Sequence, residues 1–121
     1  MALTEFGKTV RKARIDTGYT LLTMSEELGT TPAYLSGLET GGKKISKKWV
    51  EKIDNFFKSK NFEIKNLQAL ADLANKTVAI DGLTYQQQML VAGFANSRFT
   101  PDELAQFSAL LNRINKPKET E

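Results

Sequence analysis

The pattern of apolar and polar positions predicts two short helices in the first third of the chain. Met24, Ser25 and Leu28 share one face of the first helix. Leu35 and Leu38, three residues apart, share one face of the second. Each predicted helix therefore buries one side and exposes the other.

Signals between these helices indicate a tight turn. Gly29 suits the left-handed conformation that ends a helix, and Thr31-Pro32 is typical of an N-cap followed by proline at the first helical position. The turn has only about three residues. Such a unit sets the second helix nearly perpendicular to the first and standing out from the body.

Three more helices are predicted in the first half of the chain and just beyond it. Thr4 begins a helix that runs to about Thr17, Ser46 caps a fourth helix, and a fifth follows a polar break at 59–63. Their inner faces are predicted to hold Phe6, Val10 and Ile15, then Trp49, Val50, Ile53, Phe56 and Phe57, and finally Leu67, Leu70, Ala71 and Ala74.

The last third of the chain has its own turn and capping signals. The Asp-Gly pair at 81–82 is typical of a turn. Thr84 and Thr100 each begin a capping box, which predicts helices near 85–96 and 101–114. Both are amphipathic and joined by about four residues, so a helical hairpin is expected.

Composition narrows the chemistry that the chain can perform. There is no cysteine and no histidine among the 121 residues, which excludes disulfides, thiol nucleophiles and the common zinc and imidazole sites. The adjacent acids Glu26-Glu27 and Asp102-Glu103 point in different directions on a helix and are not a catalytic pair. We expect no enzyme activity, no metal and no cofactor. Without a signal-peptide pattern or an apolar run of about 18 residues, we expect a cytoplasmic protein with no membrane partner.

Positive charge is concentrated in the first half of the chain. Residues 1–60 hold 11 basic and 7 acidic side chains, whereas residues 61–121 hold 6 and 7. A run of charge usually marks a solvated surface. If the second short helix entered a groove of DNA, the lysines that directly follow it would instead lie where a phosphate backbone passes.

From about Phe6 to about Phe57 the sequence resembles the Cro and phage-repressor family of helix-turn-helix proteins, also called lambda-repressor-like. The resemblance implies an all-α fold with a five-helix DNA-binding domain at residues 1–76. The capping signals and apolar pattern beyond it predict a C-terminal two-helix hairpin at 77–116 and a frayed tail at 117–121. An ordinary helical hairpin would explain the apolar positions equally well but not the outward side of the second short helix. The resemblance rests on Gly18, Met24, Ser25, Leu28, Gly29, Tyr34, Leu35, Ser36, Leu38, Glu39 and Gly41, with Arg11 and Arg14 upstream.

The resemblance implies a sequence-specific regulator of transcription, repressor-like, from a phage or another mobile element. It would bind double-stranded DNA at an operator as a homodimer, with the helix 32–40 in the major groove. Arg11 and Glu39 correspond to a pair that joins the first helix to the third in this family. Arg14 and Lys8 are expected to be exposed.

The candidate base-reading residues are all small. Many family members have long amides or arginines at these positions, so this chain departs from the pattern. We expect contacts with thymine methyl groups and with DNA shape more than a dense hydrogen-bond code. The candidates are Thr31, Pro32, Ala33, Ser36, Gly37 and Thr40.

The candidate phosphate contacts lie on both sides of the recognition helix. At the start of the preceding helix, free backbone amides and the positive dipole end suit an anion. Leu21 stands where many family members have a glutamine that grips a phosphate. The candidates are Thr20, Thr23, Tyr34, Lys43, Lys44 and Lys47.

The C-terminal hairpin is expected to supply the dimer contact, because two recognition helices bind far better than one. Two alternatives stay open: the hairpin packs on its own first domain, or it binds a protein partner, as in an antitoxin or inhibitor that uses DNA binding for autoregulation. The expected dimer residues are Met89, Leu90, Gly93, Phe94, Phe107, Leu110, Leu111 and Ile114.

Overall fold

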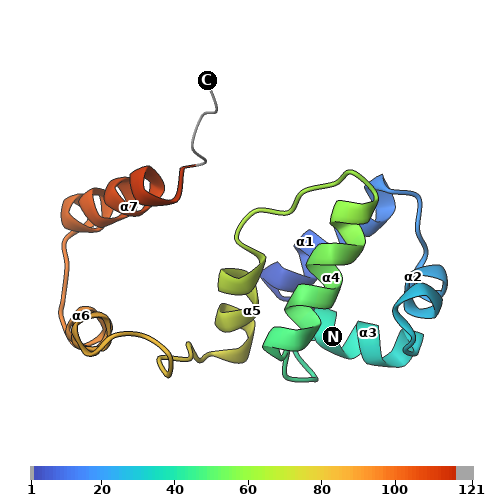
Figure 1. The fold of residues 1–121 in the computed structure, drawn as a ribbon, viewed down its shortest axis with the longest axis horizontal. Helices are drawn as coiled ribbons and strands as arrows, with labels where there is room; N and C mark the ends of the chain where they lie inside the picture. Colours follow the sequence, from blue (N-terminus) through green and yellow to red (C-terminus); the bar gives the residue numbers. More distant parts are fainter. Residues whose placement is uncertain (1, 117–121) are drawn as a thin grey trace. The chain divides into compact units, whose positions relative to one another are not determined.

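Seven helices and no strand make up residues 2–116, the part of the chain that the computed structural model describes (Figure 1). The all-helical class is therefore confirmed for this part, and the predicted frayed tail at 117–121 lies outside it. The helices are α1 (Glu5–Asp16), α2 (Leu21–Leu28), α3 (Pro32–Thr40), α4 (Lys47–Ser59), α5 (Leu67–Asn75), α6 (Tyr85–Ala95) and α7 (Pro101–Asn115).

The chain divides into two units, Met1–Ala79 and Ile80–Glu121. The first unit contains α1 to α5, and the second contains α6 and α7. The two units are described separately below.

The predicted turn between α2 and α3 is present. Gly29 ends α2 with a φ of 72°, in the left-handed region that favours glycine. The Thr31 side chain accepts a hydrogen bond from the backbone N–H of Tyr34, and Pro32 is the first residue of α3. These local signals fix where α2 ends and where α3 begins.

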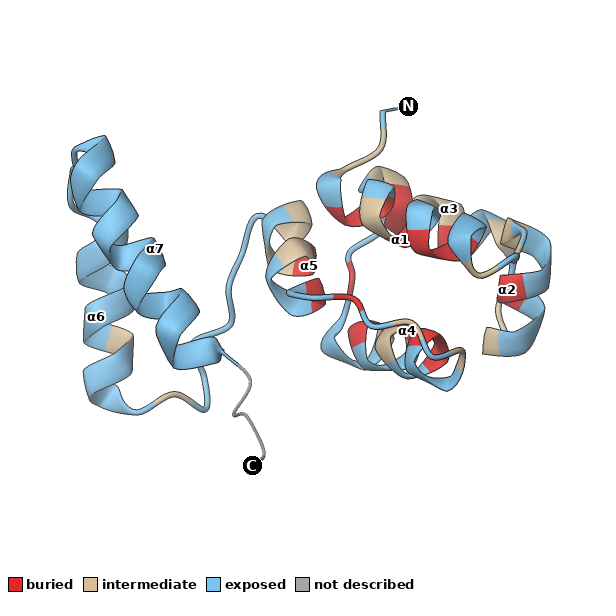
Figure 2. Ribbon diagram, turned by 90° about the horizontal axis from the view of Figure 1, so that it is seen from above, coloured by how far each residue is buried: buried red, intermediate tan, exposed pale blue. Residues whose placement is uncertain are grey.

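A single apolar core joins the five helices of the first unit. Figure 2 shows its buried residues in red on the elements of this unit. Two of them, Ile45 and Ile64, lie outside helices, Ile45 in the loop between α3 and α4 and Ile64 just after the predicted polar break at 59–63. The core consists of Phe6, Val10, Ala13, Met24, Leu35, Leu38, Ile45, Val50, Ile53, Phe56, Phe57, Ile64, Leu67 and Ala71.

The prediction of one core residue in α1 is wrong. Ile15 is 61% exposed, whereas Phe6, Val10 and Ala13 are buried. At 100° per residue, position 15 falls on the opposite side of the helix from these three. The buried side of α1 instead continues to Arg14.

α1 lies directly against the end of α3. A Cβ atom on Gly7 would overlap the backbone carbonyl of Glu39, so only glycine allows this approach. Just before α1, the backbone N–H and the hydroxyl of Thr4 both donate to the same carbonyl, at 3.1 and 3.2 Å. α1 thus holds the C-terminal end of α3 by backbone contact.

The second unit is a hairpin of two capped helices. Thr84 and Thr100 both form the predicted capping boxes. Inside the hairpin, the rings of Phe94, Phe99 and Phe107 form a cluster with centroids 4.8 to 5.3 Å apart. None of the residues that the structure describes in α6 or α7 is buried.

The approach of α1 to α3 predicts that Gly7→Ala destabilises the chain. The added methyl group overlaps a backbone atom that cannot move away without separating the two helices. We expect the free energy of unfolding to fall by about 3 kcal/mol, at the upper end for overpacked sites. Urea denaturation measures it, and Lys12→Ala, at an exposed position of the same helix, should change it by less than about 0.5 kcal/mol. Equal effects of the two substitutions would contradict the prediction.

Candidate nucleic-acid interface

The outward side of α3 is accessible along its length. Leu35, Leu38 and Glu39 are buried on the inward side. Helical spacing places Ala33, Ser36, Gly37 and Thr40 on the other side, while Pro32 lies at its edge and Thr31 precedes the helix. Thr31 and Ala33 are exposed, and the partly buried ones are Pro32, Ser36, Gly37 and Thr40. Four of the six predicted positions thus share the outward side of α3.

A hollow borders this surface where α3 meets α1 and the start of α2. Ser36 and Thr40 line it from α3, and Leu21 lines it from the first position of α2. Arg11, Arg14 and Glu39 form its charged side, and Leu3 completes the lining. Hydroxyl groups, a helix start and guanidinium groups therefore meet beside the outward side of α3.

The hydroxyl groups at the start of α2 are already engaged. The Thr20 hydroxyl accepts from the backbone N–H of Thr23 at 3.0 Å, and the Thr23 hydroxyl accepts from the backbone N–H of Thr20 at 2.9 Å. This reciprocal cap leaves the backbone N–H groups of Leu21 and Leu22 in the first turn, where a helix has no acceptor of its own. An anion at this end would meet backbone amides more readily than the two hydroxyls.

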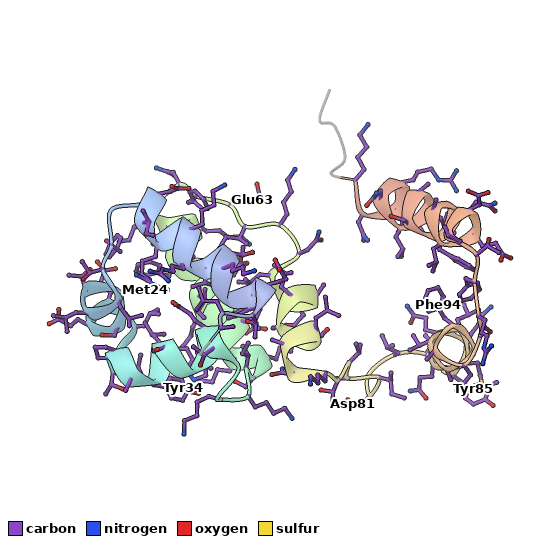
Figure 3. All side chains as sticks on the ribbon, turned by 180° about the vertical axis from the view of Figure 1, so that it is seen from behind. Met24, Tyr34, Glu63, Asp81, Tyr85 and Phe94 are labelled. Carbon is purple, nitrogen blue, oxygen red and sulfur yellow. The ribbon has the colours of Figure 1, made fainter. Side chains whose placement is uncertain are left out.

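Tyr34 connects α3 to α4. Its half-buried ring lies 5.1 Å from that of Trp49, with the planes tilted by 48°. Figure 3 shows Tyr34 on α3, at the edge of the first unit. Trp49, predicted as core, is likewise only partly buried and packs on the core from outside. Tyr34 is therefore mainly a packing residue at this edge.

The loop after α3 returns to the helix. The backbone N–H of Lys43 donates to the carbonyl of Gly37 at 3.0 Å, and the stem of Lys43 lies against Gly37. Lys44 and Lys47 are exposed. All three lysines predicted to contact phosphates thus lie on the stretch of chain that directly follows α3.

A side-chain clamp fixes the far end of this loop. Asn75, the last residue of α5, accepts from the backbone N–H of Ile45 at 2.9 Å and donates to its carbonyl at 2.8 Å. No local sequence pattern predicts this contact, because the two residues lie 30 positions apart. The clamp holds the loop that carries the lysines against the first unit.

The ion pair that joins α1 to α3 is formed by a different arginine from the one predicted. Nη2 of Arg14 donates to both carboxylate oxygens of Glu39, at 3.2 and 3.3 Å, and both side chains are buried. Arg11 was expected in this role but is exposed, and Arg14 was expected to be exposed. The predicted Arg11 pairing is therefore wrong, because the crossing of the two helices turns Arg14 toward Glu39. Arg11 is left on the hollow beside α2.

Burial governs the protonation of Glu39. It raises the pKa of the Glu39 carboxyl above its ordinary value, and the Arg14 guanidinium opposes the rise. Because the folded-state pKa is raised, the stability due to Glu39 is greatest below its ordinary pKa and falls as pH rises through the folded pKa. The charged pair therefore orients α3 more than it stabilises the fold.

The hairpin exposes a set of large apolar side chains. Phe94 projects from α6, as Figure 3 shows. The predicted contact residues and their exposures are Met89 56%, Leu90 68%, Phe94 46%, Phe107 41%, Leu110 42%, Leu111 57% and Ile114 65%, with Gly93 also exposed.

Comparison of the chain with protein-family models, with curated proteins and with solved structures found no match. Across residues 2–116, no cluster of acidic, histidine or cysteine side chains that could hold a metal ion is present. Within the same range, every helix is too short or too polar to cross a membrane.

The buried pair predicts a pH-dependent effect of Arg14→Met. The substitution leaves the Glu39 carboxylate buried without its partner, so the free energy of unfolding near pH 7 should fall by about 3–5 kcal/mol. Loss of the guanidinium raises the pKa of Glu39 further, so the deficit should shrink as pH falls toward about 5 and the carboxyl gains a proton. Urea denaturation at the two pH values measures both effects.

Two further variants control this prediction. Arg11→Met, at the exposed arginine, should change the free energy of unfolding by less than about 0.5 kcal/mol. Adding Glu39→Leu to Arg14→Met removes the stranded charge and should recover much of the loss. A deficit that is the same at both pH values would show that the carboxylate of Glu39 is not its cause.

Proposed function

We propose that the chain is a sequence-specific double-stranded DNA-binding regulator of transcription, repressor-like, whose first unit has the lambda-repressor-like arrangement. The observation that carries the proposal is α3. Its inward side is locked by Leu35, Leu38 and Glu39, while its outward side is small and accessible along its length. A short helix held from behind in this way can enter a major groove.

The charges around α3 support the proposal. Lys44 and Lys47 follow α3 along the chain, and Arg11 lies on the hollow at the start of α2. The backbone amides of that helix start suit a phosphate oxygen. Phosphates on either side of the groove would therefore meet positive groups on either side of α3, with the Thr20–Thr23 cap presenting the amides.

We also propose that the regulator acts as a homodimer through its hairpin. A two-fold dimer can place two recognition helices one DNA turn apart. The exposed apolar residues of α6 and α7 would be covered by the same surface of a second copy, as in a four-helix bundle. The second copy also explains why so many large apolar side chains share one short hairpin.

A binding selection tests the proposed function. The full chain should enrich specific sequences from a randomised duplex library, and its affinity for them should fall steeply with salt as counterions are released. Lys44→Ala and Lys47→Ala should each lower the slope of log affinity against log salt by about one unit without changing the selected sequence.

Lys65→Ala is the matched control, because Lys65 lies in the loop between α4 and α5, and Figure 3 shows Glu63 of this loop on the opposite side of the first unit from α3. It should leave the slope unchanged. A protein that enriches no sequence and binds no duplex at low salt would refute the proposal. An equal change of slope for Lys65→Ala would remove the assignment of the lysines.

Charge placed in the hairpin tests the dimer. Leu111→Asp puts a carboxylate on the apolar side of α7, where a second copy would bury it, so we expect a monomer by light scattering and weaker operator binding. Asn112→Asp adds the same charge on the opposite side of the helix. It should leave the dimer intact, and a dimer of unchanged strength in Leu111→Asp would exclude this surface as the contact.

A further inference from the structure

The outward side of α3 has no long side chain of its own. The six candidate base-reading residues end in methyl, methylene or hydroxyl groups, or have no side chain, as at Gly37. None can pair with two atoms of one base edge, which is how long side chains discriminate bases in the major groove. Residues of α3 alone would therefore distinguish few sequences by hydrogen bonding.

Lys43 occupies the place where a side chain of residue 37 would lie. A Cβ atom built on Gly37 would be 2.7 Å from Cγ of Lys43, 3.6 Å from its Cβ and 3.9 Å from its Cδ, and these are the three nearest atoms. The aliphatic stem of Lys43 therefore crosses the outward side of α3. Its ammonium group lies two covalent bonds beyond Cδ.

The loop fixes this position at both ends. Gly41 turns the chain back after α3 with a φ of 82°. The backbone N–H of Lys43 then bonds to the carbonyl of Gly37, and the backbone of Ile45 is clamped by Asn75. The stem of Lys43 is thus placed by backbone hydrogen bonds and by packing against α3.

The ammonium group of Lys43 would face a different part of DNA from that of a lysine beside the groove. With α3 in the major groove, phosphates form the two rims and base edges form the floor. A side chain whose stem lies against the inserted side of the helix can reach the floor. Guanine presents two acceptors there, O6 and N7, and is the usual base partner of lysine.

We propose that Lys43 reads a guanine in each half-site and so supplies the long side chain that α3 lacks. The inference rests on the proposed function, and it replaces the sequence-based expectation that Lys43 contacts a phosphate. Glycine at position 37 then has a specific role, because the absence of a side chain leaves space for the stem of Lys43.

The test compares two lysines in the full chain, using the duplex enriched in the selection described above. Lys43→Met keeps an aliphatic stem and removes the charge, and Lys44→Met is the matched control. We expect Lys43→Met to weaken binding to the selected duplex about tenfold and to remove the preference for guanine at one position in each half-site. Lys44→Met should weaken binding to all duplexes alike.

A base analogue identifies the contact directly. Replacing that guanine by 7-deazaguanine removes the N7 acceptor, so it should weaken binding of the unaltered chain and leave binding of Lys43→Met unchanged. Gly37→Ala should also reduce the guanine preference, because its methyl group displaces the stem of Lys43. Combined with Lys43→Met, it should reduce that preference no further.

The outcomes separate this inference from the proposed function. If Lys43→Met weakens all duplexes equally and no guanine position responds to the analogue, Lys43 is a phosphate contact and the inference is wrong, while DNA binding stands. If the unaltered chain binds no duplex, both the proposed function and the inference fail.

Discussion

Glu39 is the residue through which α1 controls the position of α3. Its carbonyl lies against Gly7 and accepts two hydrogen bonds from Thr4, while its carboxylate accepts from Arg14. The other buried residues of α3, both leucines, make only non-directional contacts with the core. The rotation of α3 about its own axis, and hence the side it presents outward, therefore depends most on this junction.

The junction is better suited to orientation than to stability. A buried ion pair loses the hydration of both charges, and such pairs are often no more stabilising than apolar residues of the same size. Here burial raises the pKa of the Glu39 carboxyl in spite of Arg14. Glycine at position 7 also costs helix stability relative to alanine. Both features are unfavourable locally, yet together they hold α1 directly against the end of α3.

The sequence predicted what depends on neighbours along the chain. The caps at Thr4, Thr31 and Ser46 and the left-handed Gly29 are local hydrogen-bond and backbone effects, and all are present. The paired arginine depends instead on how two helices cross, which a single sequence does not reveal. Burial of isoleucines outside helices and the clamp between α5 and the loop are equally non-local. The exposure of Ile15 was different, because counting helical angles would have revealed it.

The candidate site shows the same difference between local effects, which the sequence predicts, and contacts between separate segments, which it does not. Helical spacing correctly gathers the outward residues of α3, because they belong to one element. Lys43 lies beyond the end of that helix, so no helical period places it over Gly37; the return of the loop does. The outward side of α3, whose own residues are small, thus gains the lysine side chain of the following loop. For short helices ending in a tight loop, the reading surface has to be derived from helix and loop together, since the loop can change the chemistry of the surface while the helix keeps its packing.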